Sequence, residues 1–93
     1  MENSQNRFAF VIPVYNHGGT VSMVVRQAQA LGYPVFVVVD GSTDETPLRL
    51  AEIQGIHLLR HAQNTGKGAA ILTGFAAVSH VADFAITIDA DGQ

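Results

Sequence analysis

Residues 35–42 read Val-Phe-Val-Val-Val-Asp-Gly-Ser, and this stretch decides the fold class. Its first five side chains are apolar on both faces and mostly β-branched, which is typical of an interior strand of a parallel sheet. The run stops at Asp40-Gly41-Ser42, a combination that favours a turn. We therefore expect a buried parallel strand over 35–39 with polar residues at its carboxyl end.

The sequence on both sides of this strand alternates between apolar runs and helical periodicity. Further strands are expected over 8–14, 56–59 and 84–88, and helices over 20–31, over 42–53 and after the loop 64–68. The expected apolar faces of the first and third helices are Val21, Val24, Val25, Ala28 and Leu31, and Ile71, Phe75 and Val78. Strands that alternate with helices predict right-handed crossovers and a mostly parallel sheet between helix layers, a three-layer α/β/α fold.

Composition restricts the class of protein. The chain has 93 residues and a formal charge of −3, so it lacks the clustered basic residues that a nucleic-acid binder needs. Charged residues make up only 14% of the sequence, against about 25% in typical domains, which suggests one part of a larger core. Without cysteine there is neither a disulfide nor a thiolate metal site.

No apolar run is long enough to span a bilayer, and the N-terminus does not resemble a signal peptide. We therefore expect a cytoplasmic location.

Polar residues follow each expected strand, and the carboxyl ends of parallel strands are where ligands bind in open α/β sheets. Two carboxylates follow the fourth strand, at Asp89 and Asp91. Such a pair favours a cation held by oxygen ligands, Mg²⁺ or Mn²⁺ rather than zinc. The alternative, that both are solvated turn residues before Gly92, has equal weight on this pattern alone.

Asp40 and Lys67 follow the second and third strands. Asp40 could accept hydrogen bonds from a ribose or base, although a helix cap or Asx turn is the better interpretation of that residue taken alone. Lys67 lies near a helix start, where anions bind. The glycine spacing excludes a P-loop before Lys67, and the first loop lacks the G-x-G-x-x-G of a dinucleotide site.

The histidines have no metal-ligating spacing on one element. His57, His61 and His80 are interpreted as ordinary surface or edge residues, whereas His17 lies in the loop after the first strand. No serine or cysteine nucleophile with its partners can be assembled.

Four motifs together resemble the family 2 glycosyltransferases of the GT-A fold, in the branch of the dolichyl-phosphate mannose and glucose synthases. They are Val11-Ile-Pro-Val-Tyr-Asn16, Val38-Val-Asp-Gly-Ser-Thr-Asp-Glu-Thr46, Asn64-Thr-Gly-Lys-Gly-Ala69 and Ile88-Asp-Ala-Asp-Gly-Gln93. The resemblance covers nearly the whole chain. It implies that residues 1–93 form the Rossmann-like half that binds a nucleoside-diphosphate sugar, UDP- or GDP-linked, with the first four strands in the order 3-2-1-4.

The resemblance also implies roles for individual residues. Asp89 and Asp91 would be the D-x-D acids that hold Mg²⁺ or Mn²⁺, with Gln93 completing the metal shell and Asp91 counted as catalytic. The residues that would contact the donor are Pro13, Val14, Tyr15, His17, Asp40, Lys67 and Asp89. The acceptor would be a polyprenyl phosphate, which would place the full-length protein at the inner face of a membrane.

The chain departs from the family in three places. Val39 stands where the family has a first aspartate, and His17 where it has glutamate. The sequence also stops at Gln93, before the part that supplies the acceptor site, so we expect an N-terminal fragment that is inactive alone. Its fourth strand would then be an open apolar edge, which predicts self-association. Two alternatives stay open, a nucleotidyltransferase and a non-catalytic nucleotide-binding or assembly module.

Overall fold

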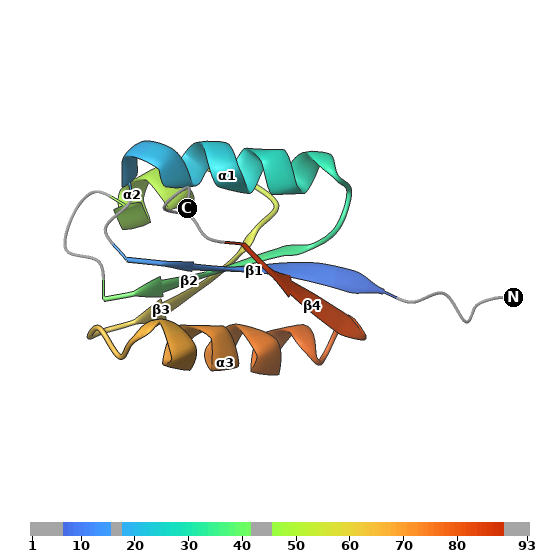
Figure 1. Cartoon of the computed structure of the whole chain (residues 1–93). Coiled ribbons are helices and arrows are strands. Elements are labelled where there is room, and N and C mark those ends of the chain that lie inside the picture. Colours follow the sequence, from blue (N-terminus) through green and yellow to red (C-terminus); the bar gives the residue numbers. More distant parts are fainter. Residues whose placement is uncertain (1–6, 16–17, 42–45, 89–93) are drawn as a thin grey trace, which may run out of the picture.

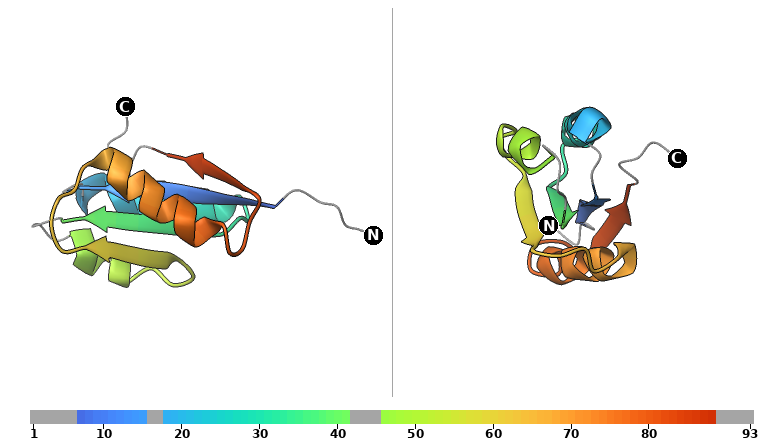
Figure 2. Two further views of the ribbon diagram at one scale, coloured as in Figure 1. Left: turned by 90° about the horizontal axis from the view of Figure 1, so that it is seen from below. Right: turned by 90° about the vertical axis from the view of Figure 1, so that its left-hand side faces the viewer.

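The computed structural model describes residues 7–15, 18–41 and 46–88. Its helices and strands are β1 (Phe8–Val14), α1 (Gly18–Ala30), β2 (Val35–Asp40), α2 (Thr46–Ala51), β3 (His57–His61), α3 (Lys67–Val78) and β4 (Phe84–Thr87). The strands form one parallel sheet in the order β3-β2-β1-β4. Helices α1 and α2 cover one face of the sheet and α3 covers the other (Figure 1 and Figure 2). The predicted α/β/α architecture and strand order are confirmed.

The two central strands form the middle of the core. Every residue of β2 is buried, and so is every residue of β1 after Phe8. Since successive side chains of a strand point to opposite faces, each of these strands contributes to two apolar layers. Phe10, Ile12, Val35 and Val37 pack toward α1 and α2, with Leu50 among their partners. The opposite layer contains Ala9, Val11, Phe36, Val78 and Ala82.

Helix α3 packs closely on the sheet. The large side chains of the expected face, Ile71, Phe75 and Val78, would not allow so close an approach. Its buried residues are Ala70, Gly74 and Val78, while Phe75 is 41% exposed. A Cβ atom on Gly74 would overlap Cγ1 of Val11, so the helix approaches β1 closely where it has no side chain. The apolar face expected for α3 is therefore wrong except at Val78, because small residues rather than large ones form the contact.

The ends of several elements differ from the expected ones. Helix α1 ends at Ala30, and the turn at Gly32, with φ of 87°, leaves Leu31 64% exposed rather than on the buried face. Helix α2 is shorter than expected, and its predicted start at 42–45 lies outside the described residues. Strand β3 continues to His61, beyond the predicted end at residue 59.

Strand β4 lies at one edge of the described sheet and pairs with β1 from Phe8↔Phe84 to Val11↔Thr87. Unlike the central strands it is largely exposed, with Phe84 49% and Ile86 41% accessible. The apolar side chains of this strand are thus only partly covered by the described part of the chain.

Candidate functional site

The carboxyl ends of the strands bring two predicted site residues, Tyr15 and Asp40, to one edge of the sheet, together with one histidine that is not a predicted site residue. Tyr15 follows β1, Asp40 ends β2 and His61 ends β3. On the other side of β1, the N–H of Ile88 donates to the carbonyl oxygen of Val11 at 3.1 Å, so the chain leaves β4 at the same edge. Because all strands are parallel, these positions form one rim.

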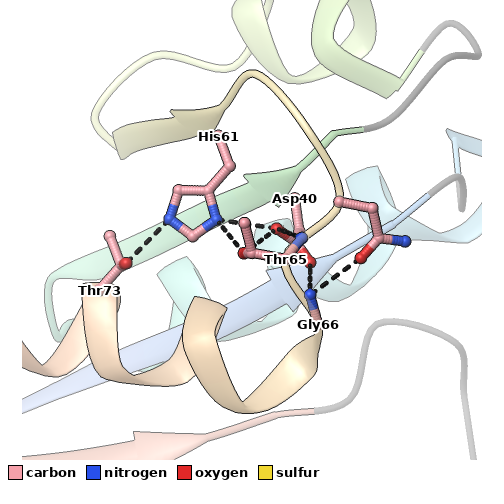
Figure 3. A network of polar contacts seen from close by, with 6 residues as sticks. Asp40, His61, Thr65, Gly66 and Thr73 are labelled. Atoms are coloured by element: carbon pink, nitrogen blue, oxygen red, sulfur yellow. Dashed lines mark hydrogen bonds and ion pairs between the residues drawn. The ribbon is translucent and has the colours of Figure 1, made fainter.

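Asp40 is the one buried polar or charged residue among those described, with 3% of its surface exposed. Its Oδ1 accepts hydrogen bonds from the N–H of Thr65 at 3.0 Å and from the Thr65 hydroxyl at 2.7 Å. Its Oδ2 accepts one from the N–H of Gly66 at 2.8 Å. Nδ1 of His61 lies 2.8 Å from Oδ1 (Figure 3). The carboxylate thereby joins the end of β2 to the end of β3 and to the loop before α3.

These contacts determine the protonation state of Asp40. Burial by itself disfavours the charged carboxylate and would raise its pKa. The hydrogen bonds from the Thr65 N–H, His61, the Thr65 hydroxyl and the Gly66 N–H outweigh burial and lower the pKa of Asp40 to about 2. Asp40 is therefore an anion at neutral pH, and its buried charge is held by donors from β3 and the following loop.

His61 connects this carboxylate to α3. Its side chain is 19% exposed, and its Nε2 lies 2.8 Å from the hydroxyl oxygen of Thr73. An ionised carboxylate only accepts hydrogen bonds, so Nδ1 carries a proton and donates to Asp40. In the neutral imidazole, Nε2 then accepts a hydrogen bond from Thr73.

The loop after β3 passes directly over Gly41. This glycine has φ of +74°, and a Cβ atom there would lie 2.5 Å from the backbone carbon of Gln63 and overlap the backbone of Asn64. Farther along the loop, Oδ1 of Asn64 accepts a hydrogen bond from the N–H of Gly66 at 2.9 Å. Only a residue without a side chain allows this approach, which explains the glycine after Asp40.

The predicted donor-binding residues differ in how exposed they are. Pro13 and Val14 are buried at the end of β1, whereas the ring of Tyr15 is 42% exposed. Lys67 is exposed and begins α3. Both carboxylate oxygens of Asp40 make hydrogen bonds within the chain, so direct contact of Asp40 with a nucleoside stays a prediction.

Other predicted residues lie outside the described part of the chain. They are His17, Asp89, Asp91 and Gln93. The described ranges themselves contain no group of three His, Cys, Asp or Glu side chains that could hold a metal ion. The carboxylate and amide oxygens of Asp89, Asp91 and Gln93 are a donor set that Mg²⁺ or Mn²⁺ accepts. In the sequence they come after Ile88, the last described residue.

The interpretation of His61 as an ordinary edge residue is wrong. Asp40 and His61 are register partners on neighbouring strands, so their side chains point to the same face, the one that α3 covers. The sequence contains one signal for this, since both strands change from apolar to polar residues at their carboxyl ends. His57, by contrast, is exposed and stacks on Phe36 with ring centroids 4.3 Å apart.

The comparison with known protein families identifies the class of protein. The family model described as glycosyl transferase family 2 matches residues 9–93, which is nearly the whole chain. The chain belongs to this family. The match extends across all four strands, the described loops at the rim and the acidic segment that follows β4.

Among curated proteins, three relatives are informative. The chain is 34% identical to an uncharacterized protein of Methanocaldococcus jannaschii, over 99% of this chain and 38% of that protein. It is 32% identical to the UDP-N-acetylglucosamine–dolichyl-phosphate N-acetylglucosaminyltransferase of Methanococcus voltae, over 89% and 40% of the two chains. It is 35% identical to the undecaprenyl-phosphate 4-deoxy-4-formamido-L-arabinose transferase of Erwinia tasmaniensis, over 99% and 31%. The chain therefore spans between 31% and 40% of these relatives' length.

Solved structures agree with the fold. The glucosyl-3-phosphoglycerate synthase of M. tuberculosis superimposes with a TM-score of 0.79 at 26% identity, over 92% of this chain and 34% of that one. A second mycobacterial protein gives a TM-score of 0.78 at 24% identity, over 92% of this chain and 31% of that one, and supports the fold alone. Within the described ranges, no helix combines the length and the hydrophobicity required to cross a membrane.

Proposed function

We propose that this chain forms the donor-binding half of an inverting, metal-dependent glycosyltransferase that moves a sugar from a UDP- or GDP-linked donor. The observation that carries the proposal is the family match over residues 9–93, which includes both the rim of the sheet and the Asp89-x-Asp91 segment. It favours glycosyl transfer over the nucleotidyltransferase alternative. A nucleotide-binding module without activity stays the interpretation of the 93-residue chain taken alone.

The nucleoside of the donor binds at the end of β1 in this proposal. The exposed ring of Tyr15 offers a surface against which a base or ribose can pack. Pro13 and Val14 are buried, so they act by fixing the position of Tyr15 rather than by offering their own side chains. His17 belongs to the same loop and Asp40 ends the neighbouring strand.

The diphosphate of the donor lies between Lys67 and the acidic segment. Lys67 supplies a positive charge at the start of α3. Asp89 and Asp91, with Gln93, would hold Mg²⁺ or Mn²⁺, and Asp91 is the ligand that we count as catalytic. Such a cation would supply positive charge to the diphosphate as the leaving group, while inversion requires the acceptor oxygen to attack from the opposite side of the sugar.

The acceptor in this proposal is a polyprenyl phosphate. Two relatives have dolichyl phosphate or undecaprenyl phosphate in their names, which supports this class. A phosphate oxygen is already anionic at neutral pH, so it needs no strong base to attack. Such a substrate places the full-length enzyme at the inner face of a membrane.

The chain also associates with itself through β4 in this proposal. Phe84 and Ile86 are exposed on a strand that pairs only with β1 among the described residues, and unpaired apolar edges favour association. A second copy presents the same edge, so a two-fold dimer is the simplest arrangement.

Nucleotide binding tests the proposed function. UDP and GDP are titrated into the chain by calorimetry in the presence of MnCl₂, MgCl₂ or EDTA. We expect weak binding, with a dissociation constant between roughly 0.1 and 1 mM, because the chain spans only 31% to 40% of the length of its relatives. Binding should disappear in EDTA. Tight binding that is the same in EDTA would contradict the proposal.

A further inference from the structure

A polar chain crosses from the middle of α3 to the loop that begins this helix. It runs from Thr73 through His61 to Asp40, and from there to Thr65 and Gly66 (Figure 3). We propose that His61 is a positioning residue, which fixes the start of α3 and thereby places Lys67 for the diphosphate of the donor. This inference rests on the proposed function and adds to it a residue that would not touch the substrate.

The side chain of His61 is itself restrained. Both ring nitrogens have partners at 2.8 Å, Asp40 on β2 and Thr73 on α3. A ring held at both nitrogens by two different elements has a fixed orientation. The side chain is also mostly buried, so water competes poorly for either contact.

Hydrogen bonds connect Asp40 to the start of α3. Asp40 accepts hydrogen bonds from the backbone N–H groups of Thr65 and Gly66. Gly66 is the cap residue of α3, and its carbonyl oxygen accepts the hydrogen bond from Ala70 N–H at 3.0 Å that closes the first helical turn. Lys67 follows directly. The position of the Asp40 carboxylate therefore helps to determine where α3 begins. Nδ1 of His61 contacts Oδ1 of that carboxylate beside the Thr65 hydroxyl, whose oxygen lies 2.9 Å from Nδ1.

The role of His61 is separate from the apolar packing of α3 on the sheet. The apolar layer under α3 is formed by Ala9, Val11, Phe36, Val78 and Ala82, without the residues of the polar chain. Thr65 and Gly66 are exposed, and Asp40 is the side chain that contacts both of their backbone N–H groups, with Asn64 as a further partner of Gly66. Loss of the His61 contacts is therefore expected to release the loop while the packing of the helix against the sheet persists.

Three variants test the inference. His61→Ala removes both contacts, whereas His61→Asn keeps an N–H donor near the position of Nδ1 and so retains the bond to Asp40. His57→Asn is the matched control, because His57 lies on the same face of the same strand but stacks on Phe36 outside the polar chain. Thr73→Val removes only the hydroxyl that faces Nε2, with almost no change of volume.

Two measurements are made on each variant. Amide hydrogen exchange of Thr65 and Gly66 reports on the loop without any ligand. NMR titrations with UDP and uridine, and with GDP and guanosine, in MgCl₂ report on binding with and without the diphosphate. For His61→Ala we expect exchange at both amides to accelerate at least about tenfold, and diphosphate affinity to fall about fivefold to tenfold, as for loss of one hydrogen bond of ordinary net strength. Nucleoside affinity should stay unchanged, and His61→Asn should recover most of the loss.

The outcomes distinguish this inference from the proposed function. If the unaltered chain binds neither nucleotide, the proposed function fails, and so does the role of His61 toward the diphosphate. The amide exchange rates then still decide whether His61 orders the loop. Equal loss of nucleoside and diphosphate binding in His61→Ala would indicate a merely structural role and overturn the inference. If His61→Ala does not fold, Thr73→Val decides, with about twofold to threefold faster exchange expected from the loss of one neutral hydrogen bond. Wild-type exchange and binding in the variant that folds would overturn the inference.

Discussion

Asp40 and His61 end two neighbouring parallel strands as register partners, and Nδ1 of the histidine lies 2.8 Å from Oδ1 of the carboxylate. The pair lies at the point where β2, β3 and the start of α3 meet. A buried charge is stable there because donors from β3 and from the loop that follows it surround the carboxylate. The same arrangement fixes the loop that carries Lys67, so the stability of the fold and the shape of the candidate donor site depend on one carboxylate.

The first prediction concerns the charge of Asp40. Asp40→Asn keeps the shape but turns one carboxylate oxygen into a donor, so the backbone N–H of Thr65 or of Gly66 loses this acceptor. We expect the free energy of unfolding at pH 7 to fall by about 2–4 kcal/mol, the cost of breaking a buried charged network. Urea denaturation measures it. A loss below about 0.5 kcal/mol, the range of ordinary surface changes, would show that the contacts contribute little.

The second prediction concerns pH. The pKa of Asp40 is lowered to about 2 in the folded chain, below its ordinary value of 3.8. A depressed pKa contributes stability that is fully present above about pH 4 and is lost as the pH falls toward 2, up to about 2 kcal/mol. Urea denaturation from pH 7 to pH 2 should show this loss in the unaltered chain. The loss should be smaller by this amount in Asp40→Asn, and identical pH profiles would contradict the assignment.

Much of the fold could be predicted from the sequence because the central strands leave little choice. Val35 to Val39 is apolar on both faces, which only an interior strand tolerates, and β1 begins and ends where its apolar run does. Strands that alternate with helices then determine the parallel order of the sheet. Each of these features depends on neighbours in sequence.

The features that could not be predicted depend on contacts between distant residues. Gly74 lets α3 approach Val11, so the buried face of this helix consists of small residues that hydrophobic periodicity does not single out. The role of His61 depends on its register with Asp40 and on Thr73 above it. Neither the register nor the position of α3 over β3 is visible in the local pattern around either residue.

The third prediction concerns the glycine after Asp40. Gly41→Ala forces a side chain into a backbone with φ of +74° and against the backbone of Gln63 and Asn64. We expect the free energy of unfolding to fall by roughly 2 kcal/mol or more, since neither backbone can move aside cheaply.

Gly68→Ala is the control for this change. Gly68 lies in the first turn of α3 with open space at its Cβ position, so alanine should be neutral or stabilise the chain by up to about 1 kcal/mol. Both are measured by urea denaturation. Equal effects of the two substitutions would contradict the close approach of the loop to Gly41.

The fourth prediction concerns the edge strand. Ile86→Lys places a charge on the exposed face of β4, which opposes pairing between copies of this strand. Light scattering of the unaltered chain should give a mass above that of the monomer, and the substitution should lower it. Met23→Lys, on the exposed face of α1, should leave the mass unchanged. A monomeric unaltered chain at millimolar concentration would contradict association through β4.

In the proposed function, the acids after β4 hold the cation needed for donor binding. Removal of the charge of Asp89 and Asp91 is the decisive test of this role. Calorimetry compares Mn²⁺-dependent UDP and GDP binding in the unaltered chain and in the chain with both Asp89→Asn and Asp91→Asn. Asp83→Asn is the matched control, because Asp83 is an exposed acid that contacts Arg7 at the opposite end of β4. We expect the double change to lower Mn²⁺-dependent nucleotide affinity at least about tenfold, because a hard cation loses its charged ligands. Asp83→Asn should bind nucleotide like the unaltered chain. Unchanged Mn²⁺-dependent binding in the double variant would contradict this role of the two acids.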